Sequence, residues 1–290
     1  MNKHILPIQI GRIAPAAIVL AFGLMFTPLA LANHPVLVEG NNSGNGAPGT
    51  TDVSPGKGGD SDGDGLVGVS EDNDNSTDRI FGTLTAALAA TNGGANQNGR
   101  VTVVTSGRFN EILLITGANG NVTIEGAPGV EANIDAVVAG ATDNNVRQGA
   151  SGIIIDAPAN RVVTLRNLVI RNFATGIEVK GASRVHIDNC RLENNRDHGI
   201  KVSDTAHVSI IGSQVNGSGY RAGAVGDTTA VPPTDVANPG NGITFEGDSE
   251  GLIGNTVVTG SLATGVVGNA KRVISKDVLL FDNEKNKSPK

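Results

Sequence analysis

The chain has 290 residues, a formal net charge of −6 and one cysteine. A single cysteine excludes an intrachain disulfide framework, and an acidic chain without a lysine or arginine cluster argues against nucleic acid or an anionic membrane as a partner. Glycine is abundant, with 40 residues and no G-X-Y period, which excludes collagen and suits a fold with many tight turns.

The first 32 residues have the pattern of a secretory signal peptide. Lys3 and Arg12 give a positive start, an apolar stretch follows over residues 13–31, and Ala30 and Ala32 occupy the small-residue positions that signal peptidase reads. A membrane anchor is the alternative, but prolines in the stretch and the A-x-A ending favour cleavage after Ala32. We therefore expect an exported bacterial protein, secreted or periplasmic, without a membrane span once the signal is removed. Its net charge would become −8, because two basic residues and no acid leave the total of −6.

Residues 33–78 are rich in Gly, Asn, Ser and Asp, contain few apolar residues and show no period. Such a segment buries too little surface to offset the entropy of ordering, so it is expected to be flexible. Within it, the pattern D-x-D-x-D-G-x5-E is typical of a calcium loop, in which alternate acids surround one cation. Its acids are Asp60, Asp62, Asp64 and Glu71.

The residues before this motif, 54–59, contain proline and glycine and cannot form the first helix of an EF-hand. The motif therefore resembles the calcium loops of dockerin-like and thrombospondin-type repeats. The alternative is a solvated acidic linker. Calcium is the one cofactor that the sequence suggests.

Residues 79–290 are expected to form one repeat domain. The stretch 81–90 has helical spacing and could cap the open end of a stack of repeats. After it, three sets of short segments recur in steps of 22 or 23 residues. The first set starts at Val163, Val185 and Val208; the second at Asn167, Asn189, Gly212, Asn255 and Asp277; the third at Gly176, Gly199, Gly242 and Gly265.

Two steps of 43 residues occur in these sets, and both fall at the same place. Each equals one period plus an insertion of about 20 residues. Agreement of three registers on one period is a strong indication of a solenoid.

Each repeat holds three short strands in which apolar and polar residues alternate, as they do in half-buried strands. A stack of hairpins would not give three strands per fixed period, and a leucine-rich repeat would need a helix and its own Leu/Asn spacing. The pattern predicts an all-β fold, a single-stranded right-handed parallel β-helix with a short N-terminal capping helix. Asn167 and Asn189 are expected at bends, where their side chains can hydrogen-bond along the stack.

These repeats resemble the right-handed parallel β-helix of the pectate-lyase-like superfamily over roughly residues 79–283. The segments 81–88, 107–111 and 121–126 are similar to the first coils of pectinesterase-type members. The resemblance implies a carbohydrate-related protein, but it is specific for the fold and not for an activity, since many functions share this scaffold.

The catalytic patterns of the family's enzymes are not met. The chain has no Asp-Asp pair of the kind that polygalacturonase-like hydrolases use, and no D-P-H-D motif of the alginate-epimerase type. The absence of tryptophan and the presence of one tyrosine also count against a long saccharide groove with aromatic platforms. Cys190 falls on an inward ladder, where we expect a buried small hydrophobe.

One bend is the best candidate for a site. The insertion of about residues 220–240 leaves the stack between the second and third strands, and stacking is expected to bring Tyr220 and Arg221 beside Arg196, Asp197 and His198 of the previous coil. His198 could serve as an acid or base, with Asp197 orienting it. The alternative is that these are solvated bend residues.

The leading hypothesis is a non-catalytic binding or surface-interaction module whose partner is a polysaccharide or cell-surface glycan. The alternative is a divergent polysaccharide lyase or epimerase that acts on uronic-acid polymers through those five residues. A third hypothesis is a passive scaffold with a calcium-gated arm.

Overall fold

The computed structural model describes residues 36–38, 80–81, 83–91, 98–104, 106–136, 149–219, 240–283 and 285–287, all within the compact unit Asn33–Lys290. The expected signal segment, the acids Asp60, Asp62, Asp64 and Glu71, and the pair Tyr220 and Arg221 lie outside the described residues. Among the residues described, no helix has the length and apolar character needed to cross a membrane.

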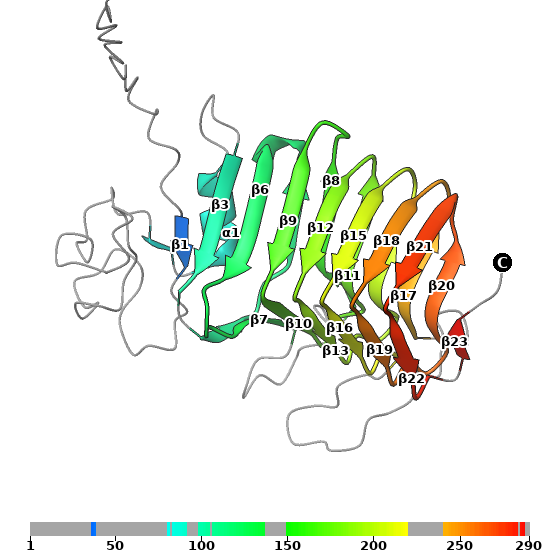
Figure 1. The fold of residues 1–290 in the computed structure, drawn as a ribbon. Helices are drawn as coiled ribbons and strands as arrows, with labels where there is room; N and C mark the ends of the chain where they lie inside the picture. The colour runs from blue at the N-terminus through cyan, green and yellow to red at the C-terminus, as the bar shows by residue number, and fades with distance from the viewer. Residues whose placement is uncertain are drawn as a thin grey trace, which may run out of the picture. The chain divides into compact units, whose positions relative to one another are not determined.

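The described strands form three parallel sheets, and the chain visits them in turn as it coils (Figure 1). Sheet A contains, in spatial order, β2 (Ile80–Phe81), β1 (Val36–Val38), β3 (Asn98–Val103), β6 (Asn121–Gly126), β9 (Val162–Arg166), β12 (Arg184–Asp188), β15 (His207–Ile211), β18 (Glu250–Gly254) and β21 (Arg272–Lys276). Sheet B contains β4 (Gly107–Phe109), β7 (Ala132–Asp135), β10 (Leu168–Arg171), β13 (Arg191–Glu193), β16 (Gln214–Asn216), β19 (Val257–Thr259) and β22 (Leu279–Phe281). Sheet C contains β5 (Leu113–Thr116), β8 (Ser151–Ala157), β11 (Thr175–Gly181), β14 (His198–Val202), β17 (Asn241–Glu246), β20 (Thr264–Asn269) and β23 (Lys285–Lys287).

Strand pairing confirms the predicted period. Val185 pairs with Val163 on one side and with Val208 on the other, so the three valines lie in one row. The expected insertion is confirmed as well, because His198 pairs with Asn241, a step of 43 residues.

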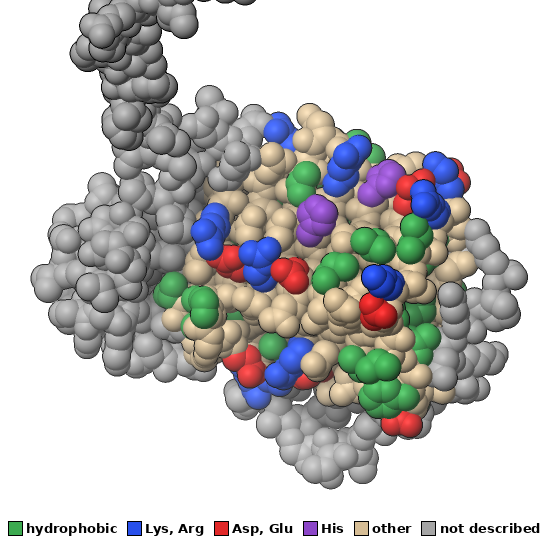
Figure 2. All heavy atoms as spheres, viewed as in Figure 1, with side chains coloured by type: hydrophobic (Ala, Val, Ile, Leu, Met, Phe, Trp, Pro, Cys, Tyr) green, Lys and Arg blue, Asp and Glu red, His purple; other side chains and the backbone are tan. Residues whose placement is uncertain are grey.

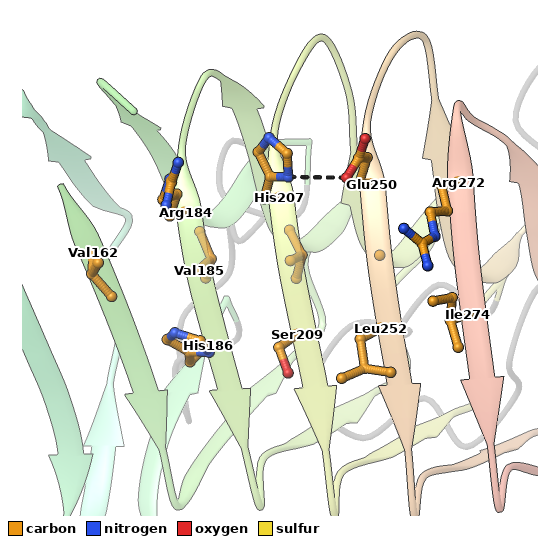
Figure 3. Close-up of a pocket in the computed structure, with 12 residues that line it drawn as sticks. Val162, Arg184, Val185, His186, His207, Ser209, Glu250, Leu252, Arg272 and Ile274 are labelled. Carbon is orange, nitrogen blue, oxygen red and sulfur yellow. Dashed lines mark ion pairs between the residues drawn. The ribbon is translucent and has the colours of Figure 1, made fainter. Parts of the chain in front are cut away.

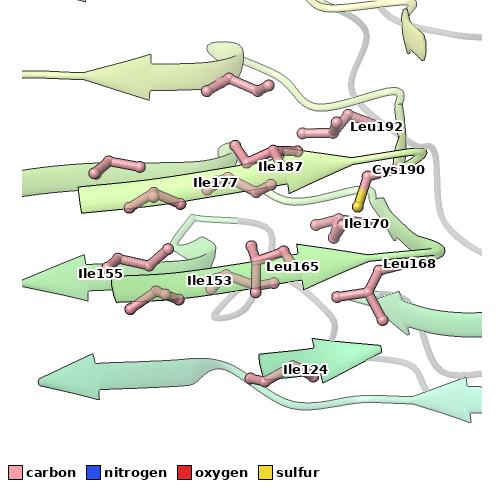
Figure 4. Close-up of a cluster of buried hydrophobic side chains, with 14 of the residues drawn as sticks. Ile124, Ile153, Ile155, Leu165, Leu168, Ile170, Ile177, Ile187, Cys190 and Leu192 are labelled. Atoms are coloured by element: carbon pink, nitrogen blue, oxygen red, sulfur yellow. The ribbon is translucent and has the colours of Figure 1, made fainter. Parts of the chain in front are cut away.

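Between the sheets, apolar side chains from successive coils stack into one continuous core (Figure 4). The inward rows are those that the repeats predict, and of their members only Leu280 in the last coil is partly exposed. Neighbouring strands lie about 4.8 Å apart, so equivalent side chains are in direct contact along each row. The all-β parallel solenoid is therefore confirmed.

The bends between sheets A and B carry the predicted asparagine ladder. Asn167 and Asn189 have φ values of 53° and 51°, in the left-handed region that asparagine tolerates better than most residues. The Asn189 Nδ2 donates to the Asn167 Oδ1 at 2.7 Å. Each ladder residue thus both permits the turn and ties its coil to the next.

The predicted helix is α1 (Leu84–Ala90), and a 3-10 turn, η1 (Gly117–Asn119), follows β5. Leu84, Ala87 and Leu88 are buried, which places the apolar face of α1 on the first coils. The Glu111 carboxylate accepts hydrogen bonds from the backbone amides of Leu84 and Thr85, at 2.9 and 2.8 Å. A carboxylate at this end satisfies amides that have no partner inside the helix.

The structure adds a strand that the repeat pattern did not contain. β1 falls within residues 33–78, the segment expected to be flexible, and it lies between β2 and β3 in sheet A. Its sequence, Val-Leu-Val, is short and stands outside the 22-residue period, so only the pairing on both sides reveals it. Sheet A therefore begins earlier in the chain than the repeats indicate.

Candidate functional site

Sheet C carries a row of polar residues, four of which are only 7–8% exposed. Strand register places Ser151, Thr175, His198 and Asn241 in line, and the Asn241 Oδ1 accepts from the backbone amide of Thr264 at 3.1 Å. The row thus crosses five coils without an apolar member. We call these five residues the polar row.

A glycine directly follows every member of the polar row. Three of these glycines lie against the next coil: a Cβ on Gly176, Gly199 or Gly242 would come within 2.7 Å of a carbonyl oxygen of that coil. At these three positions of the third repeat set, the backbone therefore approaches the next coil too closely for a side chain.

His198 is the central titratable group of this face. It is 7% exposed, and its Nδ1 lies 3.1 Å from the hydroxyl of Thr244, with a hydrogen-bond direction that depends on the imidazole tautomer. Burial, and then the charge of Lys201, lower the pKa of His198 below its usual value of 6.5. The imidazole is consequently neutral near neutral pH.

Arg196 and Asp197 lie at the bend before β14, next to His198 in the chain. The Arg196 guanidinium donates from Nε and Nη2 to the two carboxylate oxygens of Asp197, at 2.7 and 2.9 Å. Asp197 was expected to orient His198, but the imidazole Nδ1 forms its hydrogen bond with Thr244 instead. The Asp197 charge still acts on the imidazole, since it opposes the lowering of its pKa.

Two charged residues, Glu178 and Lys201, lie beside the polar row. The two residues are cross-strand neighbours on β11 and β14. Their closest polar contacts lie elsewhere: the Ser151 hydroxyl donates to Glu178 at 2.7 Å, and the Lys201 Nζ lies 3.3 Å from a Glu246 carboxylate oxygen. Lys201 is thus paired with an acid, and Glu178 is hydrogen-bonded to a member of the polar row.

Of the five residues proposed from the sequence, three are consecutive and lie together at this bend, and the remaining two are outside the described residues. Sequence reasoning missed the polar row as a unit. Its signal was present, because a polar residue precedes each glycine of the third repeat set.

The described residues also bear on the reactivity of Cys190 and on possible metal ligands. Cys190 is 1% exposed, and burial raises the pKa of its thiol to about 12, which leaves it protonated and unreactive. This confirms it as a buried small hydrophobe. Within the described ranges, no three acid, histidine or cysteine side chains come together as metal ligands would.

The lowered pKa of His198 predicts a pH dependence of stability. Because the unfolded chain binds a proton more readily than the folded one, the contribution of His198 is fully present above about pH 6.5 and is lost as the pH falls through the folded pKa. Urea unfolding at about pH 7.5 and about pH 5 should show a smaller loss of unfolding free energy in His198→Gln than in the parent chain. Equal losses in both proteins would contradict the assignment.

Comparison with known proteins agrees with this architecture. The family model described as "Right handed beta helix region" matches residues 100–261, which is more than half of the chain. Neither curated proteins nor solved structures gave a match. The three parallel sheets and this match together show that the chain belongs to the right-handed β-helix family.

Proposed function

We propose that the protein is an exported bacterial β-helix protein whose sheet C face is a non-catalytic binding or surface-interaction module for a polysaccharide or cell-surface glycan. The observation that supports this best is the polar row. Its hydroxyl, imidazole and amide groups repeat at the strand spacing of about 4.8 Å. Four members of the row are only 7–8% exposed, so a linear ligand with many hydroxyl groups would lie along the stack and contact the part of each group that remains at the surface.

The charged residues beside the row support binding in a second way. Lys201 is held by Glu246, and Glu178 is held by Ser151, so these side chains are already ordered before a ligand arrives. Ordering in advance lowers the entropic cost of binding. The export signal, which the sequence indicates, would place this face where glycans are found.

Titration calorimetry of the protein with a panel of neutral and acidic oligosaccharides tests the proposal. Binding by at least one class is expected, with about tenfold weaker affinity in Lys201→Met, since charge-assisted hydrogen bonds contribute more than neutral ones. Lys276→Met removes the same charge from sheet A and should leave the affinity unchanged. No binding to any sugar, or equal losses in the two variants, would overturn the proposal.

A divergent polysaccharide lyase or epimerase is the second candidate. It is favoured by one observation, the buried and neutral His198 beside the Arg196–Asp197 pair. A neutral imidazole can accept a proton, as a base in such a reaction must. Incubation with uronic-acid polymers would then release unsaturated or reducing ends, and His198→Ala would abolish that release. Polymers left intact by the parent protein would remove this candidate.

We also propose a weak calcium site at the acidic motif, because the sequence pattern there is typical of a calcium loop. Asp60, Asp62, Asp64 and Glu71 would bind the ion, and an extracellular site needs only weak affinity. Calorimetric titration with calcium should give heat that is lost in Asp62→Ala. Titration without heat in the parent protein would exclude the site.

A further inference from the structure

A groove of about 480 Å³ lies on the outer side of sheet A, on a different sheet from the polar row (Figure 3). It crosses the strands from β9 to β21. Residues at the starts of these strands form its rim, and residues two positions further along the strands form its floor. The rim holds Arg184, His207, Glu250 and Arg272, which are paired in register across four neighbouring strands. A volume of this size falls in the range of small-molecule sites.

One end of the groove is cationic. Arg184 has Val162 and His207 as its register neighbours, so no acid stands opposite it, and His186 lies on the same strand in the lining. The one carboxylate of the rim, Glu250, is already engaged by Lys271 at 3.0 Å and by His207 at 3.5 Å. Figure 2 shows histidine and basic side chains on this face, with acidic side chains among them. The chain as a whole is acidic, with a net charge of −6. A cationic site on its surface therefore differs in sign from the whole chain and favours the binding of an anion.

The floor at the other end of the groove is apolar, while the rim there holds Arg272, which is in register with the acid Glu250. Leu252 and Ile274 are neighbours in register and are 42% and 43% exposed. Between them and the cationic end lies Ser209, whose small side chain leaves the floor open. Exposed large hydrophobic residues beside a cationic group indicate a ligand with both an apolar and an anionic part.

We propose that this groove binds an elongated organic anion with an apolar body, of the kind represented by a medium-chain carboxylate. The carboxylate would accept hydrogen bonds from Arg184 and would lie near His207, while the hydrocarbon part would cross Ser209 and cover Leu252 and Ile274. Arg184 and Leu252 lie on strands two spacings apart, roughly 10 Å, a separation that an extended chain of this class can cover. The site is separate from the polar row and does not depend on the glycan proposal.

Titration of the full protein with octanoate at low ionic strength, followed by calorimetry and by amide chemical shifts, tests this inference. Octanoate should bind saturably. Acetate lacks the hydrocarbon chain and 1-octanol lacks the charge, so each should bind at least about tenfold more weakly than octanoate. Arg184→Met should weaken octanoate by about tenfold, and Leu252→Ser should weaken octanoate but not acetate. Lys276→Met, on β21 but outside the groove lining, is the matched charge control and should bind like the parent.

Three outcomes would overturn the inference: absence of saturable octanoate binding, equal binding of 1-octanol, or the same loss in Lys276→Met as in Arg184→Met. The altered side chains are exposed, so circular dichroism is expected to show an intact fold in every variant. Sheet C is unchanged in all of them, so glycan titration on the same samples separates a failure here from a failure of the proposed function.

Discussion

Replacing Phe245 with alanine is expected to lower the free energy of unfolding by about 3–5 kcal/mol. The ring is fully buried in sheet C, in the inward row that continues from Val202. Alanine would remove most of the side chain and leave a cavity that the stacked coils on both sides hold open. Urea unfolding followed by far-ultraviolet circular dichroism measures the loss.

Phe281→Ala is the matched control, since the same atoms are removed from a side chain that is 47% exposed, and a loss of about 1 kcal/mol or less is expected. Gly251 provides a second check, because a Cβ there would collide with the Phe245 ring. Gly251→Ala should therefore destabilise the parent protein but be tolerated in the Phe245→Ala background. Additive effects of the two substitutions would show that this contact is not what fixes residue 251 as glycine.

The β-helix was predictable because its neighbours in space are equally spaced in the sequence. Every coil buries the same positions, and a shift by one residue would turn an apolar row outward. Val163, Val185 and Val208 are thus recognisable as a row from their spacing alone, and so are the asparagines at the bends. A resemblance to β-helix enzymes added the family but not an activity, since activity depends on side chains outside this repeat.

The contacts of the site were harder to foresee. His198 meets Thr244 across an insertion, at a sequence separation of 46, whereas the sequence suggested the adjacent Asp197. Adjacent residues at a bend point in directions that only the backbone sets, and Asp197 is paired with Arg196. The groove of sheet A was missed for another reason: its rim residues are the first of their strands, one position before the valine row that defined the repeat. Strand boundaries carry the weakest sequence signal.

Replacing Gly199 with alanine is expected to cost about 3 kcal/mol, although only one methyl group is added. The new Cβ would collide with Cγ1 of Val215 and would come 2.7 Å from the carbonyl oxygen of Gly242. That carbonyl belongs to the backbone of the next coil, so it cannot move aside as the end of a flexible side chain would. The substitution must push β14 and β17 apart, and urea unfolding would report the loss of stability.

The displacement should also reach the site, because Gly199 directly follows His198, whose contact with Thr244 joins the same two strands. Amide chemical shifts of Gly199→Ala are therefore expected to change along both strands, and the His198 imidazole resonances to change with them. Gly268→Ala is the control: its Cβ would meet only Val273 at 3.9 Å, an ordinary contact, and its stability should stay within about 1 kcal/mol of the parent. If Gly199→Ala were as stable as Gly268→Ala, close packing of the backbone would not be the reason that glycine recurs in the third repeat set, and the position of His198 would need another physical cause.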